Sequence, residues 1–469
     1  MPAASGQVQT DVERFERQLE LIRRDQRFIA NPNIPPEQRS FFDYGMFTTA
    51  SYLSFDDSEL KNHGLRQYDL TAYAHLNVDG VHEFFFRGRG FYRDFNDGDS
   101  FDTEVNGADG RIERLYYKFD LSRYLSSTRG EEPPGDISIK VGQDLVFWAN
   151  GLTISQEIQG GVVDLSYGPA TVEIIAGRTP TDAVDFDSSR PNFDDHTNRF
   201  FYGAMASTRV GTHRPFVYFL GQRDHNSDDT STTTIAGTNI TTKFDYNSWY
   251  IGFGSTGGLT DRLAYGIEAV YQGGDTLSNS FAIDPSGSVT TNPQTRDDIQ
   301  AWALDGQLDY LMPDTRHTRF SGEVIVATGD SDRLVTSSTF GGNKPDTTDH
   351  AFNAFGLLNT GLAFAPAVSN IVILRGGVST FPFANVRALQ RMQVGCDLFC
   401  YSKLRGDAPI NEPTTDSAFL GFEPDVYMNW QLTSDVTLAL RYGAFVPGDG
   451  IVNDEKIRQF FYAGVTFAF

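Results

Sequence analysis

The chain has 469 residues and a formal net charge of −23. This acidic balance argues against a nucleic-acid-binding protein, because such proteins present clustered basic surfaces. No run approaches the roughly 18–20 apolar residues that a membrane-spanning helix needs. Aromatic residues nevertheless reach 13%, with 38 Phe and 20 Tyr, and glycine is abundant at 45. That composition suits strands with one lipid-facing side, aromatic belts and glycine-containing turns.

Residues 10–28 show the clearest helical periodicity. Thr10 and Glu13 form a capping-box pattern. Apolar residues recur at spacings of three and four, at Val8, Val12, Phe15, Leu19 and Ile22. We expect residues 1–36 to be an N-terminal periplasmic helix followed by a proline-rich linker. Such a helix could pack against the remainder of the fold, mediate homo-oligomerisation or bind a periplasmic partner.

The remainder reads as β-strands separated by connections of alternating length. The expected strands span 44–55, 65–77, 82–94, 110–121, 136–147, 160–167, 170–178, 198–209, 213–224, 242–255, 261–273, 297–311, 316–329, 356–365, 369–381, 419–432, 435–447 and 458–469. Connections after odd-numbered strands are mostly long, and those after even-numbered strands are mostly short. This alternation and an even strand number are typical of a single-chain outer-membrane barrel.

The last strand supports this interpretation. In residues 458–469 (RQFFYAGVTFAF), one face is wholly apolar, and the chain stops on an aromatic residue. We therefore predict an all-β fold, a transmembrane antiparallel up-and-down β-barrel of about 18 strands. It would occupy residues 37–469 and lie in the lipid of the bacterial outer membrane.

Charged residues alternate with apolar ones on several predicted strands. Since a charge facing lipid costs roughly 2–4 kcal/mol near the midplane, the charged faces should line the lumen. The expected lumen cations are Arg87, Arg89, Arg93, Arg114, Lys118, Arg375 and Arg441. Carboxylates expected nearby are Glu83, Asp120, Asp305 and Glu323. Arginines in an aqueous pore suit anion selectivity, although they could equally pair with the acids and stiffen the barrel.

Other candidate sites are weaker. Cys396 and Cys400 are the only cysteines and could close a small disulfide loop in an oxidising compartment. The acidic stretch 94–102 could hold Ca²⁺, but Asp94, Asn96 and Asp99 lack the EF-hand spacing, which favours a solvated loop. The eight histidines form no recognisable metal or catalytic motif. We expect no resident cofactor and no enzymatic activity.

Three segments resemble the alginate-export family of outer-membrane barrels. They are 440–449 (LRYGAFVPGD) with the terminal strand, 139–145 (IKVGQDL) with 160–178, and 355–383, which contains LRGGVSTFPF. The resemblance spans roughly residues 42–469. It implies an eighteen-stranded barrel that carries anionic polysaccharide through an arginine-rich lumen.

The resemblance carries over to particular residues, with departures. Arg441 matches the family's arginine before glycine, and Gly142 and Gln143 match its G-x-Q motif, although Asp144 follows where the family pattern is more basic. Residues 432–435 leave room only for a tight turn where the alginate exporter has a long plugging loop. Gating would then depend on the N-terminal helix or on an inward loop such as 95–109.

The sequence thus favours a passive channel for anionic poly- or oligosaccharides or for small anions. Two alternatives remain open. A general diffusion porin would have a wide pore and weak charge selectivity. A structural barrel would anchor envelope components through its N-terminal helix or its long loops.

Overall fold

The computed structural model describes residues 41–99, 107–130, 133–181, 189, 197–226, 230–235, 237–283, 288–333, 342–412, 414–452 and 456–469. The N-terminal helix expected over 10–28 and the domain boundary near residue 36 lie outside these ranges. Among the described residues, no helix is long and apolar enough to span a membrane.

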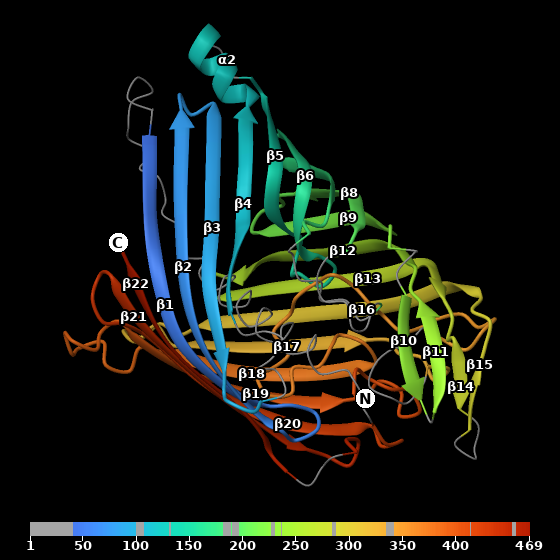
Figure 1. Ribbon diagram of the computed structural model, residues 1–469. Coiled ribbons are helices and arrows are strands. Elements are labelled where there is room, and N and C mark those ends of the chain that lie inside the picture. Colours follow the sequence, from blue (N-terminus) through green and yellow to red (C-terminus); the bar gives the residue numbers. More distant parts are fainter. Residues whose placement is uncertain are drawn as a thin grey trace.

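The fold is a closed antiparallel barrel in which a single sheet contains 18 strands (Figure 1). Each strand pairs with the next barrel strand, and β22 pairs with β1 to complete the circle. The first nine are β1 (Phe41–Asp56), β2 (Asn62–Val78), β3 (His82–Phe95), β4 (Gly107–Asp120), β5 (Gly135–Phe147), β6 (Ser155–Tyr167), β7 (Ala170–Arg178), β8 (Arg199–Thr208) and β9 (His213–Asp224). The other nine are β12 (Tyr246–Thr260), β13 (Leu263–Leu277), β16 (Arg296–Leu311), β17 (Arg319–Ala327), β18 (Ile371–Thr380), β19 (Met392–Ser402), β20 (Phe419–Gln431), β21 (Val436–Pro447) and β22 (Arg458–Ala468).

Among the described residues of the connections, there are two short hairpins and one helix. The hairpins are β10 (Thr230–Ile235) with β11 (Thr238–Lys243), and β14 (Phe281–Ile283) with β15 (Val289–Thr291). The helix, α2 (Leu121–Arg129), was not predicted. Its N-cap is Asp120, whose side chain accepts a hydrogen bond from the N–H of Arg123 at 2.9 Å. Asp120 was expected in the lumen, but it serves instead to cap this helix.

The predicted alternation of faces is present in the strands. On β22, Phe461, Val465 and Phe467 are exposed on the outer surface. Neighbouring positions such as Phe460 and Tyr462 point the other way and are buried. Successive residues of a strand face opposite sides of the sheet, so one apolar side meets lipid and the other faces the lumen. The prediction for the C-terminal strand is confirmed.

One predicted strand is wrong and one strand was missed. Residues 356–365 form no strand, although their apolar residues imitate one; they belong to the connection between β17 and β18. Met392–Ser402 forms β19 instead, within a stretch that was predicted to be a loop. The first error counted one strand too many and the second one too few. The predicted number of strands and the predicted order of long and short connections are therefore unchanged.

The connections divide the barrel into two ends. The "turn end" carries short links such as 79–81, 168–169, 261–262 and 432–435, together with α2. The "loop end" carries the long connections, including 328–370 between β17 and β18. The predicted long–short alternation is therefore confirmed.

Candidate functional site

Two segments from the loop end fold into the barrel and pack against each other. The "inner turn", 148–154, is the tip of the β5–β6 hairpin, and the "inner loop", 349–370, ends the β17–β18 connection. Ile154 and Phe355 form a parallel bridge. The N–H of Phe355 donates to the carbonyl of Thr153 at 3.0 Å, and that of Leu357 to Gly151 at 3.0 Å. Because their backbone groups pair with each other, both segments can be buried without orphaned hydrogen-bonding groups.

Aromatic side chains pack the inner loop against the wall. Phe355 meets Phe201 edge to face, with ring centroids 4.9 Å apart. Phe364 stacks on Phe445 of β21 at 4.2 Å. All four side chains are buried. Aromatic pairs of this kind add about 0.5–1.5 kcal/mol beyond the burial of their area. The apolar sequence of 352–364 thus serves an interior packing contact and not a lipid contact.

Buried carboxylates of the wall fix the two segments by hydrogen bonds. Glu268 on β13 accepts the N–H of Asn150 at 2.9 Å, and Asp305 on β16 accepts the side-chain amide of Asn150 at 2.8 Å. Glu423 on β20 accepts three backbone N–H groups, from residues 362, 363 and 364 at 2.6, 2.7 and 2.9 Å. Each of these carboxylates has an exposed fraction of 0%. The acids therefore serve to hold the segments that narrow the lumen.

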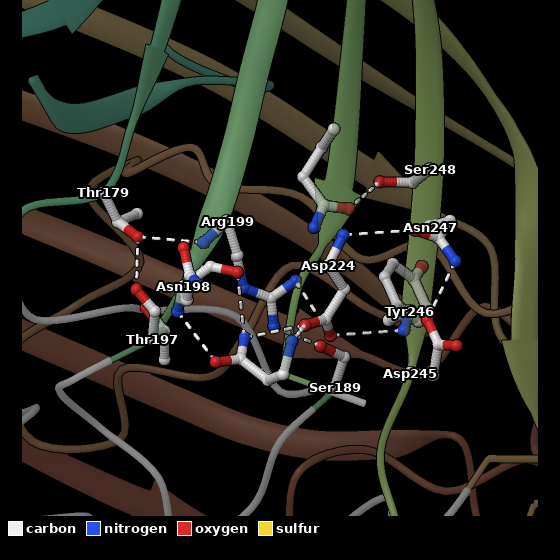
Figure 2. A network of polar contacts seen from close by, with 12 residues as sticks. Thr179, Ser189, Thr197, Asn198, Arg199, Asp224, Asp245, Tyr246, Asn247 and Ser248 are labelled. Atoms are coloured by element: carbon white, nitrogen blue, oxygen red, sulfur yellow. Dashed lines mark hydrogen bonds and ion pairs between the residues drawn. The ribbon is translucent and has the colours of Figure 1, made fainter. Parts of the chain in front are cut away.

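A polar network secures the loop-end rims of β8, β9 and β12 (Figure 2). At its centre the fully buried Arg199 forms an ion pair with Asp224, with Nη1 and Oδ2 3.8 Å apart. Asp224 also accepts from the N–H of Tyr246 at 3.3 Å. The Arg199 guanidinium lies over the ring of Phe355, 5.2 Å from its centroid. The network thus links the wall to the inner loop through a cation–π contact.

The opposite part of the wall is basic. We name its cations the cation row: Arg87, Arg89, Arg93, Arg111, Arg114, Lys118 and Lys140. Three pairs of them are direct cross-strand neighbours: Arg87 with Arg114, Arg89 with Arg111, and Lys118 with Lys140. Cross-strand neighbours point to the same face, and like charges placed directly opposite each other are destabilising.

Carboxylates partly offset this repulsion. Arg87 pairs with Glu113 at 2.6 Å, Nε of Arg89 donates to Asp69 at 2.8 Å, and Lys140 pairs with Asp144 at 2.6 Å. In the Arg87 and Lys140 pairs the cation is the more exposed partner, at 17% against 8% and 23% against 16%. Arg114 and its partner Asp144 are about equally exposed. Arg87, Arg114 and Lys140 therefore remain partly accessible to a solute from the lumen, whereas Arg89 and Arg93 are buried.

The structure brings five of the seven predicted lumen cations together in this row. The other two lie elsewhere on the inner face. Arg375 on β18 pairs with Glu323 at 2.7 Å. Arg441 on β21 donates to the side chain of Asn429 at 2.6 Å and lies over the Tyr427 ring. Glu83, also predicted in the lumen, accepts from the Tyr116 hydroxyl at 3.0 Å.

Sequence reasoning missed Arg111, Lys140, Glu268 and Glu423. Lys140 could have been found, because it alternates with Ile139 and Val141 in a strand that was predicted correctly. Arg111 could not, because the register between β3 and β4 shifts between Arg87 and Gly88. A bulge of this kind lets residues on either side of it share a face, against simple alternation.

The predicted disulfide between Cys396 and Cys400 is wrong, since both cysteines are free. They lie four residues apart in β19. Four residues of extended strand span about 13 Å, whereas disulfide-bonded Cα atoms lie within about 7 Å.

The acidic residues considered for Ca²⁺ have protein partners. Asp94 faces Arg66 at 3.5 Å, Asn96 accepts from Arg66 at 3.1 Å, and Asp99 contacts His63 at 2.8 Å. Within the described ranges, no group of three or more His, Cys, Asp or Glu residues is arranged to hold a metal ion.

Comparison with known proteins agrees with this architecture. The family model described as "Alginate export" matches residues 170–465. A search of curated proteins finds no match. Among solved structures, OpdK of Pseudomonas aeruginosa, determined with vanillate, is similar with a TM-score of 0.55 and 11% identity, over 91% of this chain and 98% of that one. OccK5 (OpdH) of Pseudomonas aeruginosa is similar with a TM-score of 0.54 and 10% identity, over 91% and 97%.

At such low identity these structures support the fold alone, whereas the family model covers more than half of the chain. The resemblance seen in the short motifs is confirmed. The chain belongs to the alginate export family, and its closed barrel is a channel of the bacterial outer membrane.

Proposed function

We propose that this channel conducts anionic solutes that bear carboxylate groups, uronate oligosaccharides included. The observation that carries the proposal is the set of cross-strand cation pairs, Arg87–Arg114, Arg89–Arg111 and Lys118–Lys140. A wall with like charges opposite each other is unfavourable for folding alone. An anion that passes through the channel can bind between two such cations and relieve their repulsion. Arginine suits this role because its guanidinium binds carboxylates bidentately.

The cation row is also long enough to offer several binding sites one after another along the channel. Lys118 lies opposite Glu83 at one end of β3, and Arg111 lies opposite Arg89 further along the strand. These levels are six residues apart on β3, which corresponds to about 20 Å along the strand. Conduction requires several sites that are individually weak, so that a bound ion can leave. We infer that successive carboxylates move along the row while Asp69, Glu113 and Asp144 moderate its affinity.

The acids of the far wall do not cancel this preference. Glu268, Asp305 and Glu423 are fully buried and accept hydrogen bonds from the inner turn and the inner loop. A carboxylate that is covered in this way presents little charge to a solute in the lumen. The inner turn and the inner loop also occupy part of the lumen. Their presence favours a selective channel over a wide, unselective pore.

The test is single-channel recording in a planar bilayer under a salt gradient, with and without a polyuronate oligomer. We expect anion preference and reversible block by the oligomer. Replacement of Arg87, Arg114 and Lys140 by Gln should shift the reversal potential toward cation preference. A matched control removes three cations outside the row, Lys61, Arg123 and Arg405, and should leave it unchanged.

Other outcomes would redirect the assignment. Equal shifts in the two triple variants would mean that overall charge, and not the row, sets selectivity. A large, weakly selective conductance indifferent to the oligomer would support a general porin. Block by small carboxylates alone would limit the substrates to small anions.

A further inference from the structure

The barrel wall is interrupted between β4 and β5. β4 pairs with β3 along most of its length, from Gly107 to Phe119. Its pairing with β5 covers only the stretch from Leu115–Gln143 to Asp120–Ser138. In the part of the chain that the structure describes, the β4–β5 ladder therefore stops at Leu115, and beyond it the Ile112 carbonyl accepts a hydrogen bond from the Gln143 side chain at 2.7 Å. An edge of this kind is unusual in a closed barrel, whose closure otherwise removes free edges.

The interruption arises because the β5–β6 hairpin bends into the barrel. Its two strands stay paired up to Phe147 and Ser155. β6, however, pairs with β7 only from Gln159 onward, and residues 155–158 are buried inside. The bend occurs at Gly142, whose φ of +141° suits glycine, and where a Cβ would lie 2.1 Å from the carbonyl oxygen of Leu115. In Figure 1, β5 and β6 curve away from β4.

A cavity of about 740 Å³ occupies the interruption, and we name it the wall cavity. Part of its lining comes from the outer, lipid-facing surface: Leu70, Phe86 and Ile112, all exposed. Another part consists of inner-face charges: Arg89, Arg111 and Glu157. Gln143 and Gln159 also line the cavity, and the Gln143 amide donates to the Ile112 carbonyl at 2.7 Å. The cavity therefore joins the inner and outer faces of the barrel.

Glycines make room on the outer face. Gly88, Gly90 and Gly110 line the cavity on adjacent strands, and no side chain lies within 4 Å of where a Cβ of Gly90 or Gly110 would be, whereas the Phe86 ring covers Gly88. Just beyond them toward the loop end, Tyr68 and Tyr92 are cross-strand neighbours and both are exposed. Aromatic belts mark the membrane interface. The wall cavity thus lies on the membrane side of this tyrosine pair, within the apolar band.

We propose that the wall cavity binds an anionic amphiphile, a molecule with a single acid group and a hydrocarbon tail. The acid group meets Arg111 and Arg89, the two cations of the lining, of which Arg89 also donates to Asp69; Glu157 is the carboxylate of the lining. The tail lies over Gly90 and Gly110, against Leu70, Phe86 and Ile112. The site differs from the proposed path of polar anions in its apolar, outward-facing part, and it shares Arg89 and Arg111 with the cation row. Free fatty acids and acidic lipids both have this chemistry.

The test uses dodecanoate as the probe, with the full-length protein in phosphatidylcholine nanodiscs and equilibrium dialysis against empty nanodiscs. We expect saturable binding of dodecanoate, and much weaker binding of dodecanol, which lacks the charge, and of butyrate, which lacks the tail. Gly90→Leu should fill the cavity without backbone strain. A Cβ added at Gly90 would have the Asp109 carbonyl oxygen as its nearest neighbour, at a distance of 4.0 Å. The affinity for dodecanoate should fall about tenfold or more. A tenfold loss is what the tail would suffer if roughly two of its methylene groups lost their contact with the protein.

The matched control is Gly322→Leu on β17, an outer-face glycine with open space around it and outside the cavity. It should bind dodecanoate like the parent protein. Equal binding by both glycine variants, or no saturable binding at all, would overturn the proposal. Loss of binding when phosphatidylglycerol is added to the nanodiscs would identify an acidic lipid as the occupant, and retention a free amphiphile. The reversal potential of Gly90→Leu should stay unchanged, which separates this test from that of the proposed function.

Discussion

Oε2 of Glu423 accepts a hydrogen bond from the N–H of Phe364 at 2.9 Å, which fixes the inner loop to β20. The same carboxylate accepts two further backbone N–H groups from residues 362 and 363. A buried carboxylate with three such donors replaces the backbone partners that an irregular segment lacks. One side chain thus fixes the backbone of residues 362–364, in addition to the aromatic contacts of the inner loop.

Replacement of Glu423 by Gln should loosen the inner loop. The amide keeps one oxygen acceptor but loses the charge, and its NH₂ group is a donor that faces other donors. We expect a loss of about 1–3 kcal/mol in the free energy of unfolding and a larger, noisier single-channel conductance. Glu59→Gln in the exposed β1–β2 connection is the control and should change neither. A variant with unchanged conductance noise would show that the loop is held by its aromatic contacts alone.

The pair of Arg375 and Glu323 on neighbouring strands should behave as a coupled unit. The Glu323 side chain is 3% exposed, and its partner is 2.7 Å away. Arg375→Met should destabilise the barrel by about 3 kcal/mol, because it leaves a buried carboxylate without its cation. Arg375→Met combined with Glu323→Gln should recover part of that loss. Denaturant unfolding in micelles of the two single variants and the double variant measures the coupling, and strictly additive effects would contradict it.

The thiols of Cys396 and Cys400 should both be free in the protein isolated under oxidising conditions. Both lie on β19 at positions whose neighbours, Val378 and Leu374, are exposed on the outer surface. Intact mass after alkylation under denaturing, non-reducing conditions should show two labels per chain. The Cys396→Ser variant should show one label and the same thermal stability. A parent mass without labels would indicate a bond that the strand geometry forbids.

The barrel could be predicted from the sequence, but the segments inside it could not. Apolar residues recur at every second position of a barrel strand because one face of the strand meets lipid. Phe461, Val465 and Phe467 show this pattern directly in the sequence. Phe355, Leu357 and Phe364 have the same apolar character, so residues 356–365 were predicted as a strand, yet their burial comes from packing inside the lumen. Apolar periodicity does not distinguish lipid from a protein interior.

The candidate site was predicted in part for a related reason. The charged faces of β3 and β4 were assigned to the lumen because lipid excludes charge from the other face, and the structure places Arg87, Arg89 and Arg93 on one face of β3. The inward bend at Gly142 and the bulge between β3 and β4 are backbone features that depend on partners distant in sequence. Alternation within one strand carries no information about them.

The connection that leads into the inner loop, residues 342–352, should loosen in acid, because Asp330 organises it. Burial alone would raise the pKa of this carboxyl, but hydrogen bonds outweigh burial and lower the pKa below its usual value. They come from Asn343 and from the N–H groups of Asp332 and His350, at 3.0, 2.8 and 2.7 Å. A lowered pKa in the folded state means that the stabilisation is fully present above the unfolded-state value. It is lost as the pH falls through the folded-state value.

Hydrogen exchange of residues 342–352, compared between about pH 6 and about pH 3 after correction for intrinsic rates, measures this effect. Protection should fall at the lower pH in the parent protein. Asp330→Asn should show the weaker protection already at the higher pH and little further change. Asp314→Asn is the control, because the pKa of Asp314 is also lowered, by the Thr318 hydroxyl and backbone, but it lies in the β16–β17 turn at the opposite end of the barrel. If the two variants lose protection in 342–352 to the same extent, the effect is global destabilisation and not the release of a loop that Asp330 holds.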